Sequence, residues 1–291
     1  MIPSAFEYHA PSSVSEAIAL LQKYGDEAKV LSGGHSLLPL MKLRFATPEH
    51  IVDINGVKEL AYLKEEGGVL KIGALAREVD LERSSTVMSK FPLIADAVKV
   101  IADPQVRNRA TVAGNLAHGD PANDHPAVML ALGAELTLQG PKGSRTLPVD
   151  KFFLDTLTTA LAPGELLTEI RIPLPPAKSG GAYIKIERKV GDFATAAVGV
   201  QVTLDGAGAC KSAGIGLTNA GRVPIKATAA EAYLKGKKLD EATLKEAGRL
   251  AADASDPATD TRAPAAYKKA MVKELTIRAL RKAAARAAGG K

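Results

Sequence analysis

Along the chain, apolar residues recur with two different periods. Between Ser13 and Gly25 they are spaced three and four residues apart, and Ser13 followed by Glu16 has the spacing of a capping box. This pattern predicts a helix that ends at Gly25, because glycine readily adopts the positive φ found at helix C-termini. Further helical patterns occur at 92–101, at 125–132, and in three segments that start near residues 227, 240 and 265.

Other segments have the short apolar runs or the alternation that are typical of strands. Strands are predicted at 28–31, 49–54, 134–140, 165–173, 182–189 and 212–219, with a hairpin at 62–75. Because helices and strands do not alternate strictly, the pattern favours an α+β fold over a parallel α/β fold.

Proline and glycine are concentrated at 173–181, and such a segment cannot continue a strand ladder. We therefore expect two domains, residues 1–176 and residues 177–291. The first is expected to divide into subdomains of about 1–56 and 57–176.

The composition, 46% hydrophobic and 24% charged, is that of an ordinary globular protein. Cys210 is the only cysteine, so this chain alone cannot form a disulfide, an iron–sulfur cluster or a cysteine-rich zinc site. The N-terminal segment has no signal-peptide pattern, and no apolar run approaches the length of a membrane span. A cytoplasmic location is expected.

Positive charge is concentrated near the C-terminal end, where residues 262–291 hold nine Lys or Arg and one Glu. One interpretation is a solvated helix face with cations near its C-terminus, where the helix dipole favours them. The other is a surface that docks on an acidic partner or on an anionic membrane as a peripheral protein. Nucleic acid is not expected as a partner, because aromatic residues are not interleaved with these charges.

Two glycine-containing segments, 32–36 and 111–115, are both predicted to be loops, and together they suggest a binding function. Glycine lets bare backbone N–H groups converge on an anion, and the hydroxyls of Ser32, Ser36 and Thr111 add donors suited to phosphate. One such segment alone is more typical of a plain turn, but two favour joint binding of one diphosphate. Neither segment matches the Rossmann or Walker pattern.

Two competing interpretations concern the histidines. His35 and Ser36 have the residue types of a hydrolase, but adjacent side chains usually point apart and the second glycine of a nucleophile elbow is missing. The residue types of metal ligands occur at His118, Asp120, Asp124 and His125. Their spacing matches no zinc pattern, and the same residues serve in turns and caps. We expect no catalytic acid–base residue and no metal site.

Three stretches of the chain resemble a known family: GGHSLLPLMKLRFATPEHIVDI, IADPQVRNRATVAGNLAHGDPANDHPA and KIERKVGDFATAAVGV. They resemble the medium, FAD-binding subunits of molybdenum hydroxylases, particularly those of aerobic carbon monoxide dehydrogenases. The likeness extends from Ile2 to about Ala287. It implies a PCMH-type FAD-binding domain of two α+β subdomains, followed by a smaller α+β C-terminal domain.

The resemblance also implies which residues contact FAD, since in the family the two glycine segments surround the FAD diphosphate. By motif position the contacts are Ser32, Gly33, Gly34, His35, Ser36, Leu37, Thr111, Ala113, Gly114, Asn115, Asp124, Leu167, Lys185 and Phe193. Phe193 falls where relatives have an aromatic residue near the isoalloxazine ring. Two positions depart from the family: Ser32 replaces an alanine, and Ala113 replaces a glycine, so φ at Ala113 must suit a Cβ.

The function that the resemblance implies is electron transfer through FAD in a hetero-oligomeric oxidoreductase. A large subunit with a molybdenum cofactor would oxidise the substrate, CO being the one expected, to give CO2. A small subunit with two [2Fe–2S] clusters would pass the electrons to FAD, and an external acceptor such as a quinone would receive them. A dimer of such heterotrimers is expected.

Three alternatives remain open at this point. The same kind of subunit could serve a hydroxylase for a heterocycle, an aldehyde or an aromatic compound. The chain could also be a stand-alone flavin oxidoreductase. In the third alternative it is a non-enzymatic docking module, in which the glycine segments are only turns.

Overall fold

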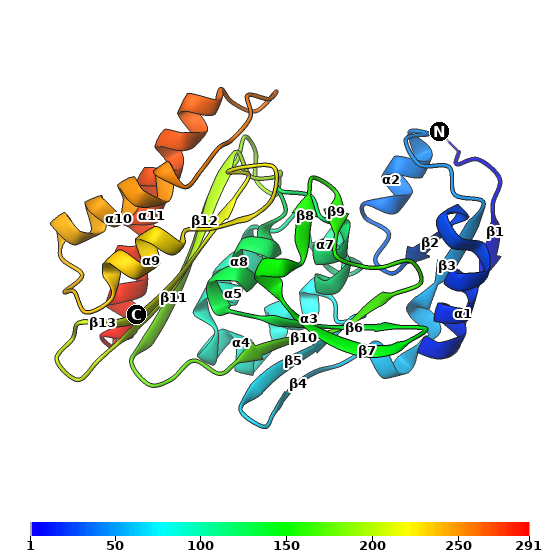
Figure 1. The fold of residues 1–291 in the computed structure, drawn as a ribbon, viewed down its shortest axis with the longest axis horizontal. Helices are drawn as coiled ribbons and strands as arrows, with labels where there is room; N and C mark the ends of the chain where they lie inside the picture. The colour runs from blue at the N-terminus through cyan, green and yellow to red at the C-terminus, as the bar shows by residue number, and fades with distance from the viewer. Residues whose placement is uncertain (1, 291) are drawn as a thin grey trace.

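The computed structural model describes residues 2–290, which form three parts arranged in a row (Figure 1). The N-terminal part is a three-stranded parallel sheet, in the order β1-β3-β2, with helix α1 packed beside β2 and β3. Its elements are β1 (Glu7–His9), α1 (Val14–Tyr24), β2 (Ala28–Leu31), α2 (Leu37–Lys42) and β3 (His50–Asp53). The predicted helix and both predicted strands are present here.

The start of α1 shows how the predicted capping pattern works. Ser13 caps the helix, because its hydroxyl accepts a hydrogen bond from the Glu16 backbone N–H. The Glu16 carboxylate, however, accepts from the backbone N–H of Ser12, so the reciprocal bond of the box is shifted by one residue. Gly25 ends the helix with a φ of 53°, as its position predicted.

The middle part is an antiparallel five-stranded sheet in the order β4-β5-β10-β6-β7, accompanied by six helices. Its elements are β4 (Leu63–Glu66), β5 (Val69–Gly73), α3 (Glu78–Arg83), α4 (Ser85–Lys90), α5 (Pro92–Val100), α6 (Pro104–Arg107), α7 (Val112–His118), α8 (Asp124–Leu132), β6 (Glu135–Gly140), β7 (Gly143–Pro148), β8 (Phe153–Asp155), β9 (Thr158–Thr159) and β10 (Leu166–Pro173). Strand β10 pairs with both β5 and β6 and so holds the sheet together.

The C-terminal part is an antiparallel sheet whose four strands follow one another in sequence order. Its elements are β11 (Ser179–Ile186), β12 (Ala196–Leu204), β13 (Cys210–Thr218), β14 (Ile225–Lys226), α9 (Thr228–Leu234), α10 (Glu241–Asp253) and α11 (Ala265–Ala287). The strand β12 was not predicted from its pattern, because its small residues Ala196, Ala197 and Gly199 weaken the strand signal. The overall arrangement confirms an α+β fold.

Helices from two parts of the chain cover the C-terminal sheet. Helix α11 packs on one face, while α5 and α8 of the middle part pack on the other (Figure 1). Gly214 and Gly216 of β13 lie so close to the α8 backbone that a Cβ at either position would collide with it. This close packing fixes the C-terminal sheet to the middle part.

The described chain has two hydrophobic cores, and their residues overlap along the sequence, so no single position separates them. One core runs from Val14 to Ala197 and includes Tyr183 of β11, and a second runs from Ala182 to Ala287. Strand β10 ends at Pro173 and β11 begins at Ser179, so the predicted boundary near 176 falls in the connection between them. The exact division of the chain into domains stays a prediction.

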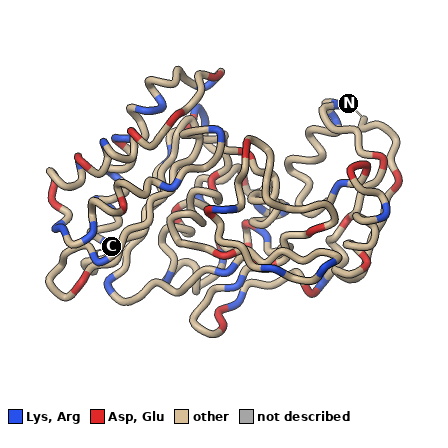
Figure 2. Tube along the Cα trace, in the orientation of Figure 1, with Lys and Arg blue, Asp and Glu red and all other residues tan. Residues whose placement is uncertain are grey.

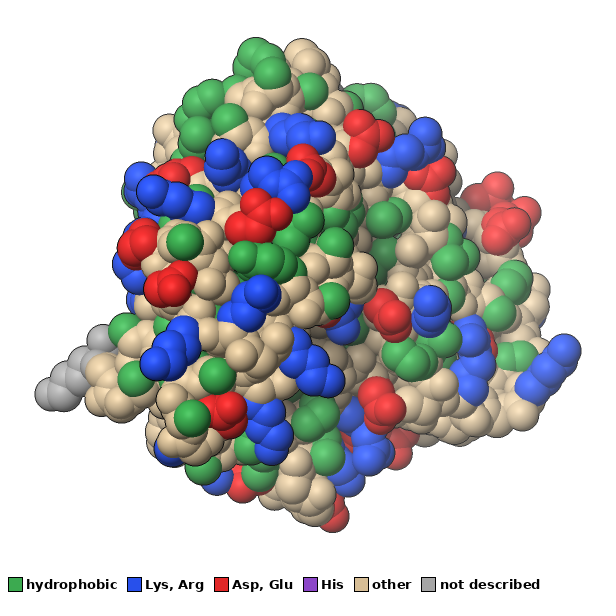
Figure 3. Space-filling model, turned by 60° about the vertical axis from the view of Figure 1, so that its left-hand side comes forward, with side chains coloured by type: hydrophobic (Ala, Val, Ile, Leu, Met, Phe, Trp, Pro, Cys, Tyr) green, Lys and Arg blue, Asp and Glu red, His purple; other side chains and the backbone are tan. Residues whose placement is uncertain are grey.

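The basic charges of the C-terminal segment are largely paired with carboxylates. The paired residues are Lys268, Arg278, Arg281, Lys282 and Arg286, with N–O distances of 2.6 to 3.0 Å, and Arg262, at 3.6 Å. Along α11 itself basic residues predominate, and most of the carboxylates that pair with them come from neighbouring segments. Positive and negative side chains are therefore intermixed over the surface of this part of the molecule (Figures 2 and 3). These pairs favour the interpretation of a solvated helix face over that of a basic docking surface.

Within residues 2–290, no helix has both the length and the apolar character needed to cross a bilayer.

Two of these ion pairs connect domains. Lys282 and Arg286 of α11 both bond Asp96 of α5, at 3.0 and 2.7 Å. Burial raises the pKa of Asp96, but the hydrogen bonds from Arg286 and Lys282 outweigh burial and hold that pKa below its ordinary value. Asp96 therefore stays ionised and links α5 to the C-terminal helix.

Candidate functional site

A cavity of about 740 Å³ lies where the three parts of the chain meet. This volume is within the range of small-molecule and cofactor sites. Its walls are formed by residues 29–46 of the N-terminal part, by α7 and neighbouring segments of the middle part, and by residues 185–193 of the C-terminal part. The residues that the sequence assigned to the cofactor all line it: Ser32, Gly33, Gly34, His35, Ser36, Leu37, Thr111, Ala113, Gly114, Asn115, Asp124, Leu167, Lys185 and Phe193. The fold thus gathers them around one space.

The first glycine segment connects β2 to α2. The backbone N–H groups from Gly33 to Leu37 donate no hydrogen bond to any group within the described residues. Gly34 has a φ of +78°, which turns the chain so that this row of donors borders the cavity. Successive unbonded N–H groups in a turn form a concave surface that binds anions.

The second glycine segment is the first turn of α7 and not a loop, so that part of the sequence prediction was wrong. Thr111 caps the helix, since its Oγ1 accepts a hydrogen bond from the Gly114 N–H at 3.1 Å. Glycine near a helix start looks like a turn in sequence, but a threonine cap compensates for its low helix propensity. Ala113 has a negative φ, as its Cβ requires.

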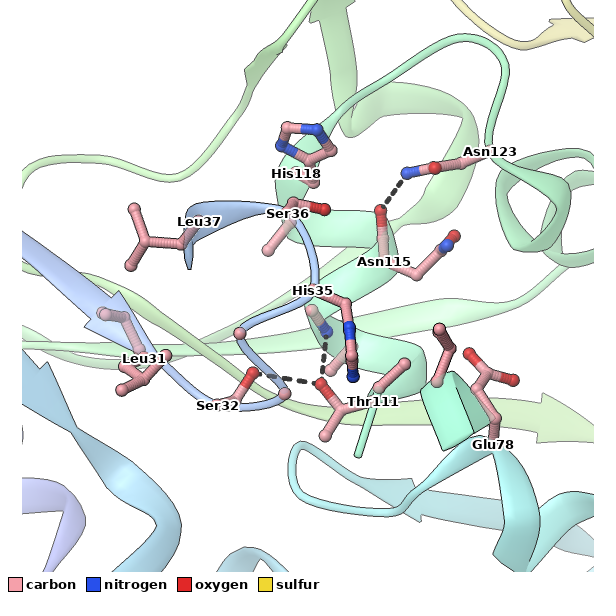
Figure 4. A pocket seen from close by; sticks show the side chains of 18 of the residues that line it. Leu31, Ser32, His35, Ser36, Leu37, Glu78, Thr111, Asn115, His118 and Asn123 are labelled. Carbon is pink, nitrogen blue, oxygen red and sulfur yellow. Dashed lines mark hydrogen bonds between the residues drawn. The ribbon is translucent and has the colours of Figure 1, made fainter. Parts of the chain in front are cut away.

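The two segments touch each other, and glycine makes this contact possible (Figure 4). A Cβ on Gly33 would lie 2.7 Å from the carbonyl oxygen of Arg109 and 2.8 Å from the Cα of Ala110. Ser32 Oγ and Thr111 Oγ1 are hydrogen-bonded at 3.1 Å. The row of free N–H groups and the start of α7 therefore border one continuous wall.

Two residues that the sequence did not single out hold these segments together. The side chain of Asn55 donates from Nδ2 to the carbonyl of Ser32 at 2.9 Å. The guanidinium of Arg77 donates both to Asn55 Oδ1 and to the carbonyl of Arg109. Neither Asn55 nor Arg77 belongs to a motif, and the sequence carries no signal that such distant positions meet.

A buried ion pair lies at the opposite wall. Lys185, whose side chain is 2% exposed, donates to Asp124 Oδ2 at 2.9 Å and to the carbonyl of Val100 at 3.0 Å. Tyr183 donates its hydroxyl to the other Asp124 oxygen at 2.6 Å. Burial raises the pKa of Asp124, and Lys185 opposes that rise. This pair joins α8 to β11 across the boundary between two parts.

The suggested metal ligands do not converge. Within residues 2–290, the groups of side chains close enough to share an ion lie elsewhere. Asp124 is occupied by Lys185, and Asp120 accepts from the backbone N–H of Ala122, as in an Asx turn. His125 bonds Glu78. Turn and structural roles therefore account for Asp120, Asp124 and His125, whereas His118 lines the cavity.

The hydrolase alternative is also not supported. Within the described part of the chain, no hydrogen bond joins His35 to Ser36. The pKa of His35 is lowered, chiefly by burial, which leaves its ring neutral near pH 7. Both side chains border the cavity, where they can serve as ligand contacts (Figure 4).

Phe193 is the aromatic residue at the cavity rim, and 43% of its surface is exposed. The guanidinium of Arg262, from the C-terminal part, lies 5.5 Å from the centroid of its ring. A ring held in this way offers an apolar face to a bound aromatic group.

Glu78 and His125 form a second buried pair beside the cavity. Glu78 Oε2 and His125 Nε2 are 2.7 Å apart, while Glu78 Oε1 and His125 Nδ1 have no hydrogen-bond partner within the described residues. Burial lowers the pKa of His125, but the charge of Glu78 and its hydrogen bond outweigh burial and raise that pKa above its ordinary value. Glu78 lines the cavity, and the sequence reading missed it.

The raised pKa of His125 predicts a pH-dependent stability. The pKa of His125 is higher in the folded chain than in the unfolded chain. The stability that protonated His125 gains from Glu78 is therefore fully present below the unfolded-state pKa, and it is lost as the pH rises through the folded-state pKa. We expect Glu78→Gln to lower the free energy of unfolding more at about pH 6 than at about pH 9. Chemical denaturation of the cofactor-free chain at both pH values measures this. An equal loss at both values would contradict it, and Glu135→Gln, an exposed acid, is the control.

Comparison with known proteins gives the family. Residues 4–175 match the family model described as the FAD binding domain in molybdopterin dehydrogenase, and residues 181–283 match that of the CO dehydrogenase flavoprotein C-terminal domain. The chain is 49% identical to the carbon monoxide dehydrogenase medium chain of Hydrogenophaga pseudoflava, over 99% of this chain and 100% of that one. It is 36% identical to the 6-hydroxypseudooxynicotine dehydrogenase complex subunit alpha of Paenarthrobacter nicotinovorans, over 99% and 97%.

A solved structure shares the whole fold. It is that of carbon monoxide dehydrogenase from Hydrogenophaga pseudoflava lacking the Mo-pyranopterin moiety, with a TM-score of 0.96 and 50% identity, covering 98% of this chain and 99% of that one. The chain therefore belongs to the family of FAD-binding subunits of molybdopterin-dependent dehydrogenases, and FAD is its cofactor.

Proposed function

We propose that this chain is the electron-transfer subunit of an aerobic CO dehydrogenase and that it holds FAD in the cavity between its three parts. A large molybdenum-cofactor subunit would oxidise CO, and a small subunit with [2Fe–2S] clusters would deliver the electrons. The 49% sequence identity to a CO dehydrogenase medium chain, which extends over the full length of both chains, supports this choice of complex. Because Cys210 is the only cysteine, and is buried, the clusters must belong to another subunit.

The observation that carries the proposal is the row of unbonded N–H groups from Gly33 to Leu37, in contact with the start of α7. A diphosphate is bound best by many hydrogen-bond donors with no carboxylate nearby to repel it. Backbone N–H groups are donors of this kind, and they carry no full charge of their own. Thr111, Ala113, Gly114 and Asn115 extend this wall. We assign the contacts to the FAD diphosphate to these two segments.

Two orphaned polar atoms fit the remainder of the cofactor. Glu78 Oε1 and Asn115 Oδ1 are buried and have no hydrogen-bond partner within the described residues, although both side chains line the cavity. An unpartnered buried acceptor costs about 1–3 kcal/mol, so each is expected to meet a donor in the functional state. The hydroxyl and amino groups of FAD are such donors.

The remaining residues position the ligand and exclude water. Bound in this cavity, FAD would supply the chemistry of electron transfer between an iron–sulfur donor and an acceptor. Phe193 provides a face for an aromatic ring, and Leu167 lines the apolar wall. Lys185 pairs with Asp124 and lies 3.2 Å from Glu187, and these ion pairs hold this wall in shape. No side chain of this chain is assigned a proton-transfer role.

Several features of the complex follow as proposals. The external acceptor is proposed to be a quinone or a similar carrier, reached in the cytoplasm or by peripheral association with the inner face of the membrane. The assembly is proposed to be a dimer of heterotrimers.

Reduction of the flavin by different substrates tests the proposed function. We expect the co-expressed three-subunit complex to lose its visible flavin absorption when CO is added anaerobically. The chain alone, loaded with FAD, should not respond to CO. A complex that responds to an N-heterocycle or an aldehyde but not to CO would assign the subunit to another hydroxylase, as the likeness to a 6-hydroxypseudooxynicotine dehydrogenase subunit allows. Turnover of a donor by the isolated chain would make it a stand-alone flavoenzyme.

A further inference from the structure

A second group of ligand-type side chains lies in the N-terminal part, outside the cavity. Glu7 and His9 are on β1, and His50 is on β3 (Figure 1). None of the three lines the flavin cavity. The parallel pairing sets Glu7 opposite His50, and alternation along β1 points Glu7 and His9 to the same face. Pairing of the strands thus places a carboxylate and two imidazoles on one face of the sheet.

The distances between the three ligand atoms suit a tetrahedral metal ion. His9 Nε2 is 3.1 Å from His50 Nδ1, and Glu7 Oε2 lies 3.4 Å from His50 Nδ1 and 3.9 Å from His9 Nε2. Zinc binds such atoms at about 2.0–2.1 Å with tetrahedral angles, which separates neighbouring ligands by about 3.3 Å. The observed triangle is therefore close to the one that an ion requires.

Packing holds both imidazole rings in place. The ring of Tyr24, at the end of α1, stacks on His50 with centroids 3.6 Å apart and on His9 at 5.0 Å. The His9 and His50 side chains are only 19% and 12% exposed, whereas Glu7 is 71% exposed and free to close over an ion. Glu27 and Glu49 bring further carboxylates within 4.8 Å of a His50 nitrogen. Such outer carboxylates commonly orient a metal-binding histidine.

We infer that Glu7, His9 and His50 form a binding site for a divalent transition-metal ion of the zinc type. Two imidazoles and one carboxylate suit zinc and its neighbours, whereas magnesium and calcium require mainly oxygen ligands. Without metal, the two facing nitrogens share a proton in a hydrogen bond, and an ion replaces that proton. A bound ion links β1 to β3. The inference is independent of the proposed function and departs from the sequence-based expectation of no metal site.

Zinc titration of the full chain, after removal of bound metals by a chelator, tests the site. We expect calorimetry to show one equivalent of Zn²⁺ bound at micromolar concentration, and no binding of Mg²⁺. His9→Gln and Glu7→Gln should each weaken zinc binding by at least about tenfold, since even outer-shell partners commonly contribute that much. Glu7 is exposed, so its substitution does not endanger the fold.

The control is Glu135→Gln, which changes an exposed strand carboxylate outside the group and should bind zinc as the wild type does. FAD uptake by each variant reports folding independently, because none of the changed residues lines the cavity. Failure of the wild type to bind micromolar Zn²⁺, or equal binding by His9→Gln, would overturn the inference.

Discussion

Gly33→Ala should weaken FAD binding by about a hundredfold, which corresponds to roughly 3 kcal/mol, the upper end of the cost of overpacking. The added Cβ would lie 2.7 Å from the Arg109 carbonyl oxygen and 2.8 Å from the Ala110 Cα. Both atoms belong to the backbone and cannot rotate away. The two glycine segments must therefore separate, and the wall that we assign to the diphosphate opens. Quenching of FAD fluorescence during titration of the cofactor-free chain measures the change.

Gly206→Ala is the matched control, because nothing lies within 4 Å of a Cβ at that position. It should bind FAD as the wild type does. Equal affinity of the two variants would show that the contact between the two segments is not needed for the cofactor. Retained thermal stability of Gly33→Ala would confirm that the loss is local.

Lys185→Met should lower the free energy of unfolding by about 3–5 kcal/mol, the range found when one partner of a buried ion pair is removed. The Lys185 ammonium bonds Asp124 and the Val100 carbonyl, and it lies 3.2 Å from Glu187. Without it, the Asp124 and Glu187 carboxylates lose the cation that they share, and Asp124 is left as a buried, unpaired charge. Denaturant unfolding of the cofactor-free chain provides the measurement.

Lys64→Met is the control for this substitution, since Lys64 pairs with Glu66 on the exposed hairpin. Exposed pairs contribute about 0–1 kcal/mol, so little change is expected there. The double variant Lys185→Met with Asp124→Asn should be more stable than Lys185→Met alone, because the uncompensated charge is gone. If Lys185→Met were no more harmful than Lys64→Met, the pair would not be a structural link between domains.

The sequence predicted the local structure well where one residue determines it. The cap at Ser13, the stop at Gly25 and the hairpin at Gly67 follow from backbone preferences of single residues, and all are present. It failed where tertiary context overrides those preferences. Gly114 suggested a loop, but the Thr111 cap and the packing of α7 against β10 make it helical.

The candidate site was predictable only in part. The two glycine segments could be recognised because anion binding requires small residues and hydroxyls that are contiguous in sequence. Glu78, Asn55 and Arg77 were not, since Asn55 follows β3 while Arg77 and Glu78 stand at the start of α3, and no motif connects the two places. His9 and His50 likewise become neighbours only through the β1–β3 pairing. Contacts of this kind depend on how the strands and helices are arranged in space, which the local pattern of apolar and polar residues does not specify.

We propose that the Gly33–Leu37 segment and the start of α7 bind the diphosphate of FAD. Comparing ADP with adenosine, which differ only in the diphosphate, tests this assignment. If several charge-assisted hydrogen bonds form, each contributing about 1.5–3 kcal/mol, the cofactor-free wild-type chain should bind ADP at least about a hundredfold more tightly than adenosine. Equal affinities for ADP and adenosine would contradict the assignment of the diphosphate to these two segments.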